Sequence, residues 1–287
     1  MKRYQETFQL VELNNTFYQY PKDSAVEKCR REAPEGFEFA VKANQEISHT
    51  YRLKLDLVAE AFNRMKGICQ ILQARVLLIQ TPGSFTPDHF GDVYEFFKRV
   101  EREDLTLVWE TRGIQWEKAE VQDELRKILG EVGVSHVTDP FRIMPVYTGC
   151  VAYFRLHGLG RRMYYYQYTN RELEELYDKI KPFDYSDREV YVLFNNLSMF
   201  EDAKRFVYSL DRGEFPSLTG LVGLDSVKAV LERTPYPLTK SMLMKKFGWR
   251  IVELEEDKQV RFEDLLKNLP SKRYKNAEEV IEQIKRV

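Results

Sequence analysis

The chain has 287 residues, and its 44 Lys and Arg nearly balance its 45 Asp and Glu, for a formal net charge of −1. Apolar residues at 43% and charged residues at 31% are typical of a folded globule and exclude an intrinsically disordered chain. The near-zero charge excludes a basic field over the whole protein, so nucleic-acid binding would need a local basic patch. No apolar run reaches the ~18 residues that span a membrane, and no apolar leader follows Met1. We therefore expect a cytoplasmic protein with no membrane partner.

Short β-branched and aromatic runs alternate along the chain with longer segments of helical spacing. The runs predict strands at residues 8–13, 37–42, 75–80, 105–110, 134–138, 151–156 and 190–194. Most of them are almost continuously apolar, as parallel strands buried on both faces are. Helices are predicted at 24–31, 56–72, 87–102 and 119–130, and a capping box of Thr169 and Glu172 predicts another at 169–180. This alternation predicts an α/β fold with a parallel sheet.

The first predicted strand is not followed by a glycine-rich phosphate motif, which favours a TIM-type (β/α) barrel over an open doubly wound sheet. A complete barrel has eight strands, whereas seven are predicted here, and the chain starts only a few residues before the first of them. We therefore expect residues 1–215 to form a barrel that lacks its first strand.

Residues 216–287 have a different pattern, which predicts a small, mainly helical C-terminal module similar to a winged or helix-hairpin domain. Helices are expected at 221–233, 239–247, 261–269 and 276–286, with one short strand at 249–254. The module holds 14 basic and 11 acidic residues, a net charge of +3. Lys240, Lys245, Lys246 and Arg250 form a modest basic face. This face is either an ordinary solvated helix surface or a contact for nucleic acid or another partner.

Polar side chains follow the predicted strands at their C-terminal ends, which in a barrel face one common mouth. These residues are Glu12, Asn14, Tyr18, Lys42, His49, Gln80, Glu110, Arg112, Asp139, Arg155, His157, Asn195 and Asn196. Any one of them could cap a helix or pair with a neighbour. Burying so many polar groups without a use would cost roughly 2–7 kcal/mol each unless all were paired. The joint pattern therefore predicts a working polar pocket. The residues expected to bind its substrate are Asn14, Tyr18, His49, Gln80, Arg112, Arg155, Asn195 and Asn196.

Two chemistries fit this pocket, and the sequence leaves both open. In the first, a divalent cation is the cofactor, and the candidate ligands are Glu12, Glu110, Asp139 and His157. In the second there is no metal, and Lys42 and Arg155 hold an anion or polarise a carbonyl. Glu12 or Glu110 then moves protons together with His157. We expect the carboxylates to raise the pKa of Lys42 and keep this residue charged, which argues against a Schiff base.

A tyrosine-rich loop follows the sixth predicted strand and contains Tyr166 and Tyr168. Aromatic rings at a barrel mouth can stack on the face of a sugar or a base, which makes these two residues candidates for substrate binding. They can equally pack the loop against the rim of the barrel. The sequence does not decide between these two interpretations.

Several of these motifs together resemble the domain-of-unknown-function 72 (YecE-like) family of TIM-barrel proteins. The matching segments are Phe8-x-x-Val11-Glu12-Leu13-Asn14-Asn15-Thr16-Phe17-Tyr18, Phe37-x-Phe39-Ala40-Val41-Lys42-Ala43, Ile47-Ser48-His49, Leu77-Leu78-Ile79-Gln80-x-Pro82, Trp109-Glu110-x-Arg112, Phe154-Arg155-x-His157-Gly158 and Tyr191-Val192-x-Phe194-Asn195-Asn196. The resemblance spans roughly residues 4–210 and implies a barrel related to the sugar isomerases, without an established reaction. Family members usually begin with a strand that carries a Gly-x-Ser-Gly-Trp-like motif, which is lacking here.

Three functions follow as hypotheses. The first is an enzyme that acts on a small sugar-like or phosphorylated substrate by acid/base chemistry, with or without a metal; the catalytic candidates are Glu12, Lys42, Glu110 and His157. The second is a metal-dependent nucleic-acid phosphodiesterase, with the basic C-terminal module as the contact. The third is a non-catalytic binding or assembly protein. The sequence leaves the substrate and the oligomeric state open.

Overall fold

The computed structural model of the protein describes residues 2–184, 188–255 and 258–286. The chain divides into two compact units. The first unit comprises Met1–Arg155 and Ile180–Leu193, and the second comprises Leu156–Lys179 and Phe194–Val287. Two segments from the predicted barrel region, 156–179 and 194–215, therefore group with the C-terminal residues. The proposed domain boundary after residue 215 stays a prediction.

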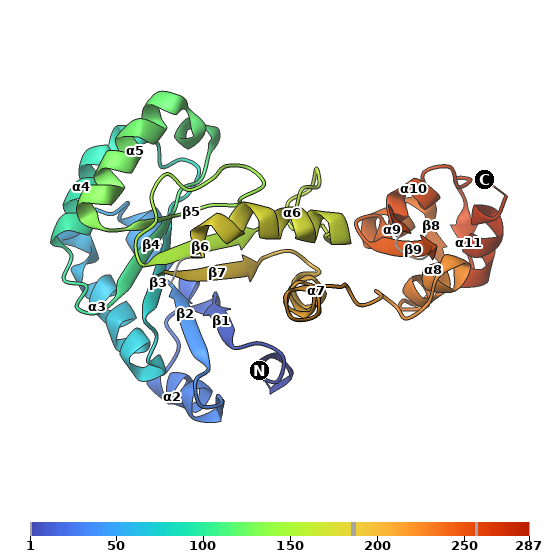
Figure 1. The fold of residues 1–287 in the computed structure, drawn as a ribbon, viewed down its shortest axis with the longest axis horizontal. Coiled ribbons are helices and arrows are strands. Elements are labelled where there is room, and N and C mark those ends of the chain that lie inside the picture. Colours follow the sequence, from blue (N-terminus) through green and yellow to red (C-terminus); the bar gives the residue numbers. More distant parts are fainter. Residues whose placement is uncertain (1, 185–187, 256–257, 287) are drawn as a thin grey trace. The chain divides into compact units, whose positions relative to one another are not determined.

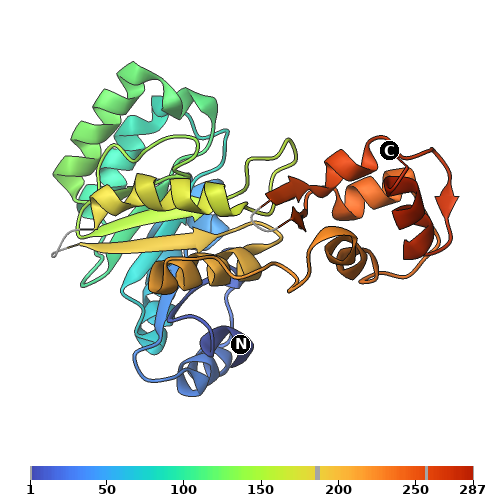
Figure 2. The same cartoon turned by 45° about the vertical axis from the view of Figure 1, so that its right-hand side comes forward.

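The seven strands predicted between residues 8 and 194 are all present. They are β1 (Leu10–Leu13), β2 (Glu38–Lys42), β3 (Val76–Gln80), β4 (Thr106–Glu110), β5 (Ser135–Val137), β6 (Val151–Leu156) and β7 (Glu189–Phe194). The first five form one parallel sheet in the order β1-β2-β3-β4-β5, so the predicted α/β fold with a parallel sheet is confirmed. Strands β6 and β7 pair with each other and lie side by side in both views (Figures 1 and 2). A parallel bridge between Thr138 and Phe154 links β5 to β6.

Two layers of apolar side chains explain why these strands read as continuous apolar runs. One layer, which we call the inner cluster, draws on all seven strands: Leu10, Ala40, Val76, Leu78, Val108, Val137, Val151, Tyr153, Tyr191 and Leu193. The alternate residues, such as Phe39, Leu77 and Trp109, belong to a second cluster that packs against the helices. Successive side chains of a strand point to opposite faces, so each strand contributes to both layers.

Helices of the first unit cover the second layer of the strands (Figure 1). They are α2 (Asp23–Glu32), α3 (Leu55–Leu72), α4 (Phe90–Arg99) and α5 (Ala119–Val132), and the short helix α1 (Lys2–Gln5) precedes β1. Helix α5 was expected to end at Gly130, but it continues for two residues and ends at Gly133, whose φ of 64° is the left-handed conformation that glycine adopts easily. Residues 2–9 contain α1 and no strand, and no pairing joins β1 to β7 in the part of the chain that the structure describes.

The second unit contains both predicted and unpredicted elements. Its helices are α6 (Asn170–Ile180), α7 (Met199–Arg212), α8 (Gly223–Leu231), α9 (Lys240–Phe247), α10 (Phe262–Leu266) and α11 (Ala277–Ile284). Its strands are β8 (Leu238–Thr239), β9 (Ile251–Glu255), β10 (Lys258–Arg261) and β11 (Arg273–Tyr274), which form the antiparallel pairs β9–β10 and β8–β11. Only β9 was expected among these strands, because β8 and β11 have two residues each and β10 has an alternating polar sequence.

In the second unit, the sequence predicted the start of α6 correctly but did not predict α7. The predicted capping box is present: the Glu172 amide donates to Thr169 Oγ1 over 3.2 Å, and the Thr169 amide donates to Glu172 Oε2 over 2.8 Å. Helix α7 was not predicted. Its apolar residues Ala203, Phe206 and Leu210 have helical spacing, so the signal was present in the sequence. The helix also buries Asp202 and Arg205. None of the described helices is long and apolar enough to cross a membrane.

Candidate functional site

The inner cluster continues into polar side chains at the C-terminal ends of the strands. Glu12, Lys42, Gln80, Glu110 and Arg155 each lie two residues after a member of that cluster. Because side chains two residues apart on a strand share a face, all five lie on the same side of their strands as the inner cluster. The predicted convergence of these strand-end residues is therefore present within the first unit.

Arg155 is the centre of this polar group, and its side chain is only 1% exposed. One terminal nitrogen, Nη2, donates to Glu12 Oε1 over 2.6 Å and to Asn14 Oδ1 over 3.3 Å. The other, Nη1, donates to Gln80 Oε1 over 3.2 Å and to Glu110 Oε2. A single buried guanidinium thus joins four residues that come from three separate motifs of the sequence. We call this set the Arg155 network.

The remaining oxygens of the two carboxylates also have partners. Glu12 Oε2 accepts a 2.7 Å hydrogen bond from the Tyr153 hydroxyl, and Glu110 Oε1 forms a 2.6 Å ion pair with Arg112. Every carboxylate oxygen of Glu12 and Glu110 therefore faces a cation or a hydroxyl donor. A divalent cation would have to displace the guanidinium groups from both of these predicted ligands.

The other two candidate metal ligands do not complete a cation site. Asp139 accepts a 3.1 Å hydrogen bond from the Phe141 amide in the turn after β5, and His157 belongs to the second unit. Within residues 2–184, 188–255 and 258–286, no three His, Cys, Asp or Glu side chains gather in a way that could hold a metal. The donor set does not fit a divalent cation, and the metal-free chemistry fits better.

Lys42 is a buried cation on the same strand face as the Arg155 network. The residue is 7% exposed, and its ammonium lies 4.0 Å from the centre of the Phe17 ring. Among the described residues, no carboxylate forms an ion pair with it. Burial lowers the pKa of Lys42 to about 8, and the positive charge of Arg155 adds to this effect. Glu110 and Glu12 do raise this pKa, as expected, but burial and the charge of Arg155 lower it by more, so the expected net rise was wrong.

We expect Lys42 to titrate near pH 8 in the folded protein, whereas exposed lysines titrate at about 10.4. Reductive ¹³C-methylation followed by NMR would resolve the Lys42 resonance, which Lys42→Arg identifies by its loss. Because the pKa is lower in the folded chain than in the unfolded chain, the unfolded chain binds more protons between about pH 8 and 10.5. The wild type should therefore gain stability relative to Lys42→Met as the pH rises through this window. Titration near pH 10.4 would contradict this assignment.

His49 and Tyr18 were predicted to bind substrate, and both lie beside Phe17. The His49 ring meets the Phe17 ring edge-on, with 5.0 Å between their centres. Burial lowers the pKa of His49, and the Lys42 charge lowers it further, so the imidazole is held in its neutral form. Tyr18 also meets Phe17 edge-on at 5.0 Å, but it is 72% exposed.

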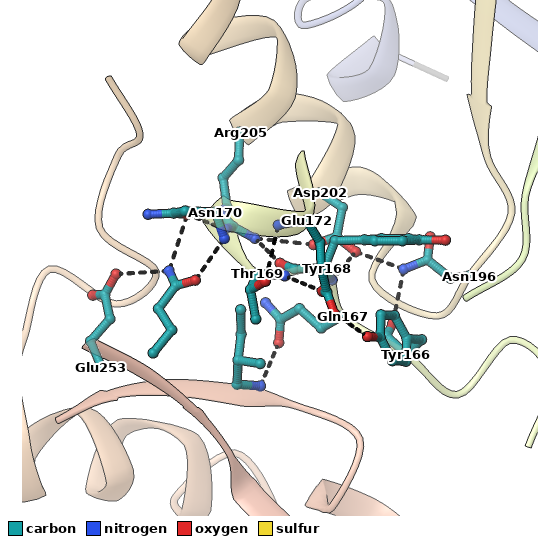
Figure 3. Close-up of polar contacts among 12 residues, drawn as sticks. Tyr166, Gln167, Tyr168, Thr169, Asn170, Glu172, Asn196, Asp202, Arg205 and Glu253 are labelled. Atoms are coloured by element: carbon teal, nitrogen blue, oxygen red, sulfur yellow. Dashed lines mark hydrogen bonds and ion pairs between the residues drawn. The ribbon is translucent and has the colours of Figure 1, made fainter. Parts of the chain in front are cut away.

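The remaining predicted site residues belong to the second unit, and Figure 3 shows how several of them are held. Asn196 Nδ2 donates to the Tyr166 carbonyl over 2.8 Å and to Asp202 Oδ2 over 2.6 Å. The Tyr168 ring is fully buried, and its hydroxyl accepts a 2.9 Å hydrogen bond from the Gly158 amide. These contacts fix the tyrosine-rich loop, which supports the packing interpretation of Tyr166 and Tyr168. Their role in stacking on a ligand stays a prediction.

Two further predicted residues in the second unit make backbone or ring contacts. The Asn195 amide donates to the Leu156 carbonyl over 2.7 Å, and the buried His157 ring lies 5.9 Å from Tyr164. Both residues belong to the second unit, whereas the Arg155 network belongs to the first. Their proposed roles in binding and catalysis stay predictions.

Gly158 should tolerate no larger residue. Its φ is +88°, and a Cβ atom there would lie 2.4 Å from Tyr166 Cβ. We expect Gly158→Ala to lower the free energy of unfolding by about 1–3 kcal/mol or more, since the left-handed backbone and the overlap both oppose the methyl group. Urea denaturation of the full chain measures this loss. Gly213→Ala is a matched control, because its φ is similar and its Cβ would meet nothing within 4 Å. An equal loss in both variants would contradict the overlap.

Sequence reasoning missed two buried polar groups. Tyr153 holds Glu12 in the first unit, and its place two residues before Arg155 in β6 was the available signal. In the second unit, burial raises the pKa of Asp202 to about 7, although this residue accepts hydrogen bonds and pairs with Arg205. The Arg205 side chain donates to the Tyr168 carbonyl over 2.7 Å (Figure 3). Both residues of this pair lie on α7, which was not predicted.

Comparisons with known proteins agree with this fold. Residues 1–216 match the sequence model of a family described as "Protein of unknown function DUF72". A DUF72 family protein of Enterococcus faecalis V583 has a similar solved structure, with 23% identity and a TM-score of 0.59 over 73% of this chain and 91% of that one. A DUF72 family protein of Thermotoga maritima MSB8 is also similar, with 23% identity and a TM-score of 0.56 over 71% of this chain and 85% of that one. No curated protein matches the chain.

Proposed function

Since the chain belongs to the DUF72 family, whose function is unknown, we propose from the site itself that the first unit is an enzyme of proton transfer. Its substrate is a small, anionic, sugar-like molecule, bound at the strand ends beside the Arg155 network. The observation that carries this proposal is the buried Lys42 ammonium, which has no carboxylate partner among the described residues and lies next to a network of fixed charges.

The charges of the site favour an anionic ligand. Lys42, Arg112 and Arg155 are cationic, and Glu12 and Glu110 are anionic, which leaves one positive charge in excess. Excess charge in a buried place is costly, and a ligand carboxylate or phosphate would relieve that cost. Arg112, with a side chain that is 20% exposed, is the guanidinium most open to such a group.

The chemistry follows from a group that can lose its proton near neutral pH. A lysine with a pKa near 8 can accept a proton from a carbon next to a carbonyl and return it, and acid/base groups work best when their pKa is near the working pH. The N–H groups of Arg155 already donate to four side chains of the protein. Arg155 could therefore bind a carbonyl or hydroxyl oxygen of the substrate only if one N–H group were shared between the two acceptors. We therefore give Arg155 a positioning role and Lys42 the proton-transfer role.

A closed barrel is part of this proposal. The inner cluster with members from all seven strands supports it. So do two contacts of β7 with residues at the N-terminal ends of β2 and β3: the Tyr191 hydroxyl donates to Glu38, and Arg75 pairs with Glu189 over 2.9 Å. Such a barrel would direct the C-terminal ends of the strands to one mouth.

The test does not require the product to be known. The full chain is incubated in D₂O with aldoses, ketoses and their phosphates, and NMR detects deuterium on the carbon next to the carbonyl. We expect incorporation into at least one phosphorylated substrate. No incorporation, together with no calorimetric binding of any compound, would overturn the proposal and favour the non-catalytic alternative.

A metal-dependent phosphodiesterase is less well supported. It would need carboxylates that are open to a cation, whereas those of Glu12 and Glu110 are bound by arginine side chains and a tyrosine hydroxyl.

A further inference from the structure

The second unit contains a cavity of about 630 Å³ that is both basic and aromatic. It lies between residues 159–166 of the tyrosine-rich loop and residues 244–267, which include the end of α9, the hairpin β9–β10 and α10. The lining includes five cations, Arg161, Arg162, Lys245, Arg261 and Lys267, and two acids, Glu263 and Asp264. The cavity therefore carries an excess of positive charge, in a chain whose overall charge is −1.

Hydrogen bonds join the tyrosine-rich loop to the β9–β10 hairpin beside this cavity. The Ile251 amide in β9 donates to Gln167 Oε1 over 3.1 Å, and Arg261 in β10 donates to the Gln167 carbonyl over 2.7 Å. Gln259 in β10 donates to Asn170 Oδ1 over 3.1 Å at the start of α6. The loop and the hairpin are thus joined by side-chain and backbone groups, so the cavity has fixed walls.

The cations of the cavity fall into two groups. Arg261 pairs with Glu172 over 3.0 Å, and Lys267 pairs with Asp264 over 2.8 Å, so these two serve the protein's own structure. Arg161, Arg162 and Lys245 are exposed, and no carboxylate of the described residues forms an ion pair with them. Three cations on one cavity without a carboxylate partner are an electrostatic footprint for a polyanion.

The aromatic side chains supply flat surfaces beside these charges. The Arg162 guanidinium lies 3.4 Å from the centre of the Tyr165 ring, which places a cation and a ring in one stack. Trp249 is half-buried on the cavity lining, with the Arg250 guanidinium 4.7 Å from its ring. Unpaired bases stack on aromatic rings and on guanidinium planes, whereas bases inside a duplex are already stacked on one another.

The basic surface continues along α9 beyond this cavity. Met244 lines both the cavity and a neighbouring one, whose cations are Lys240 and Lys272. Helix α9 therefore connects Lys240 at its start to Lys245 near its end. The row of cations from Lys240 to Lys245 is longer than a single phosphate group requires. Its length suits a ligand with several phosphates in a chain.

We propose that the second unit binds single-stranded nucleic acid along this cavity. Arg161, Arg162 and Lys245 contact the phosphates, and an unpaired base stacks beside Tyr165 or Trp249. This inference is independent of the proton-transfer function proposed for the first unit.

The test is fluorescence anisotropy of the full chain with a labelled single-stranded RNA and a single-stranded DNA of 20 nucleotides, a duplex of the same sequence, and AMP as competitor. With three phosphate contacts, log affinity should fall against log salt with a slope of about −2. Arg162→Glu/Lys245→Glu should weaken binding about tenfold or more and flatten the slope. Tyr165→Leu should weaken binding and leave the slope unchanged, because it removes a ring and no charge.

The matched control is Lys204→Glu/Arg212→Glu, which makes the same change in charge on exposed positions of α7. It should bind as the wild type does. Thermal unfolding would establish that all variants fold. Equal weakening in the control, preference for the duplex, equal affinity for AMP and for a single strand, or no retention at low salt would each overturn the proposal. Binding to RNA alone or to DNA alone would support it and identify the natural strand.

Discussion

Replacing Arg155 by methionine should lower the free energy of unfolding by about 3–5 kcal/mol, the cost of leaving buried charges without a partner. The side chains of Glu12 and Glu110 are 4% and 5% exposed, so neither carboxylate can recover its hydration when the guanidinium is removed. Urea denaturation of the full chain measures this loss.

Two further variants make this expectation specific. Arg155→Met combined with Glu12→Gln and Glu110→Gln should recover part of the lost stability, since neutral amides do not need a counter-charge. Arg99→Met removes an exposed arginine that pairs with Glu95 over 3.2 Å, and it should change stability by no more than about 0.5 kcal/mol. If Arg155→Met lowered the free energy of unfolding by less than about 1 kcal/mol, the carboxylates of Glu12 and Glu110 would not depend on Arg155 for charge compensation.

Replacing Lys42 by methionine should lower the rate of deuterium incorporation by about 10²–10⁴-fold, the usual contribution of a positioned acid/base group. Lys42→Arg separates the two roles of the ammonium. Lys42→Arg keeps the positive charge, so anion binding should persist. Because a guanidinium does not lose its proton in proteins, deuterium incorporation should fall as far as in Lys42→Met.

The pH dependence gives a second readout for Lys42. The wild-type rate should rise through a pKa near 8 as the free amine forms, whereas any residual rate in either variant should lack this step. Lys54→Met removes an exposed lysine of the same unit and should behave as the wild type. An unchanged rate in Lys42→Met would exclude Lys42 as the acid/base group, even if anion binding persisted.

The strands of the first unit were predictable because each must pack on two sides. Parallel strands covered on both faces need nearly continuous apolar runs, and runs such as 75–80 and 151–156 are visible without a structure. The strand-end polar residues were visible for the same reason, since a charged residue that ends such a run is conspicuous. Strands β8 and β11 were missed because two residues are too few to show a period, whereas α7 was missed although its apolar residues have helical spacing.

The sequence by itself determined the α/β alternation, the family, and the five strand-end residues that share a face with the inner cluster. It could not determine the charge state of Lys42, because a pKa depends on burial and on the neighbours that folding brings together. It also could not show that Arg155 would occupy the carboxylates of Glu12 and Glu110, since residues about 45 and 143 positions apart meet only in the folded chain. Only the tertiary structure showed that arginine side chains occupy both carboxylates, because electrostatic energy depends on distances in space rather than on order along the chain.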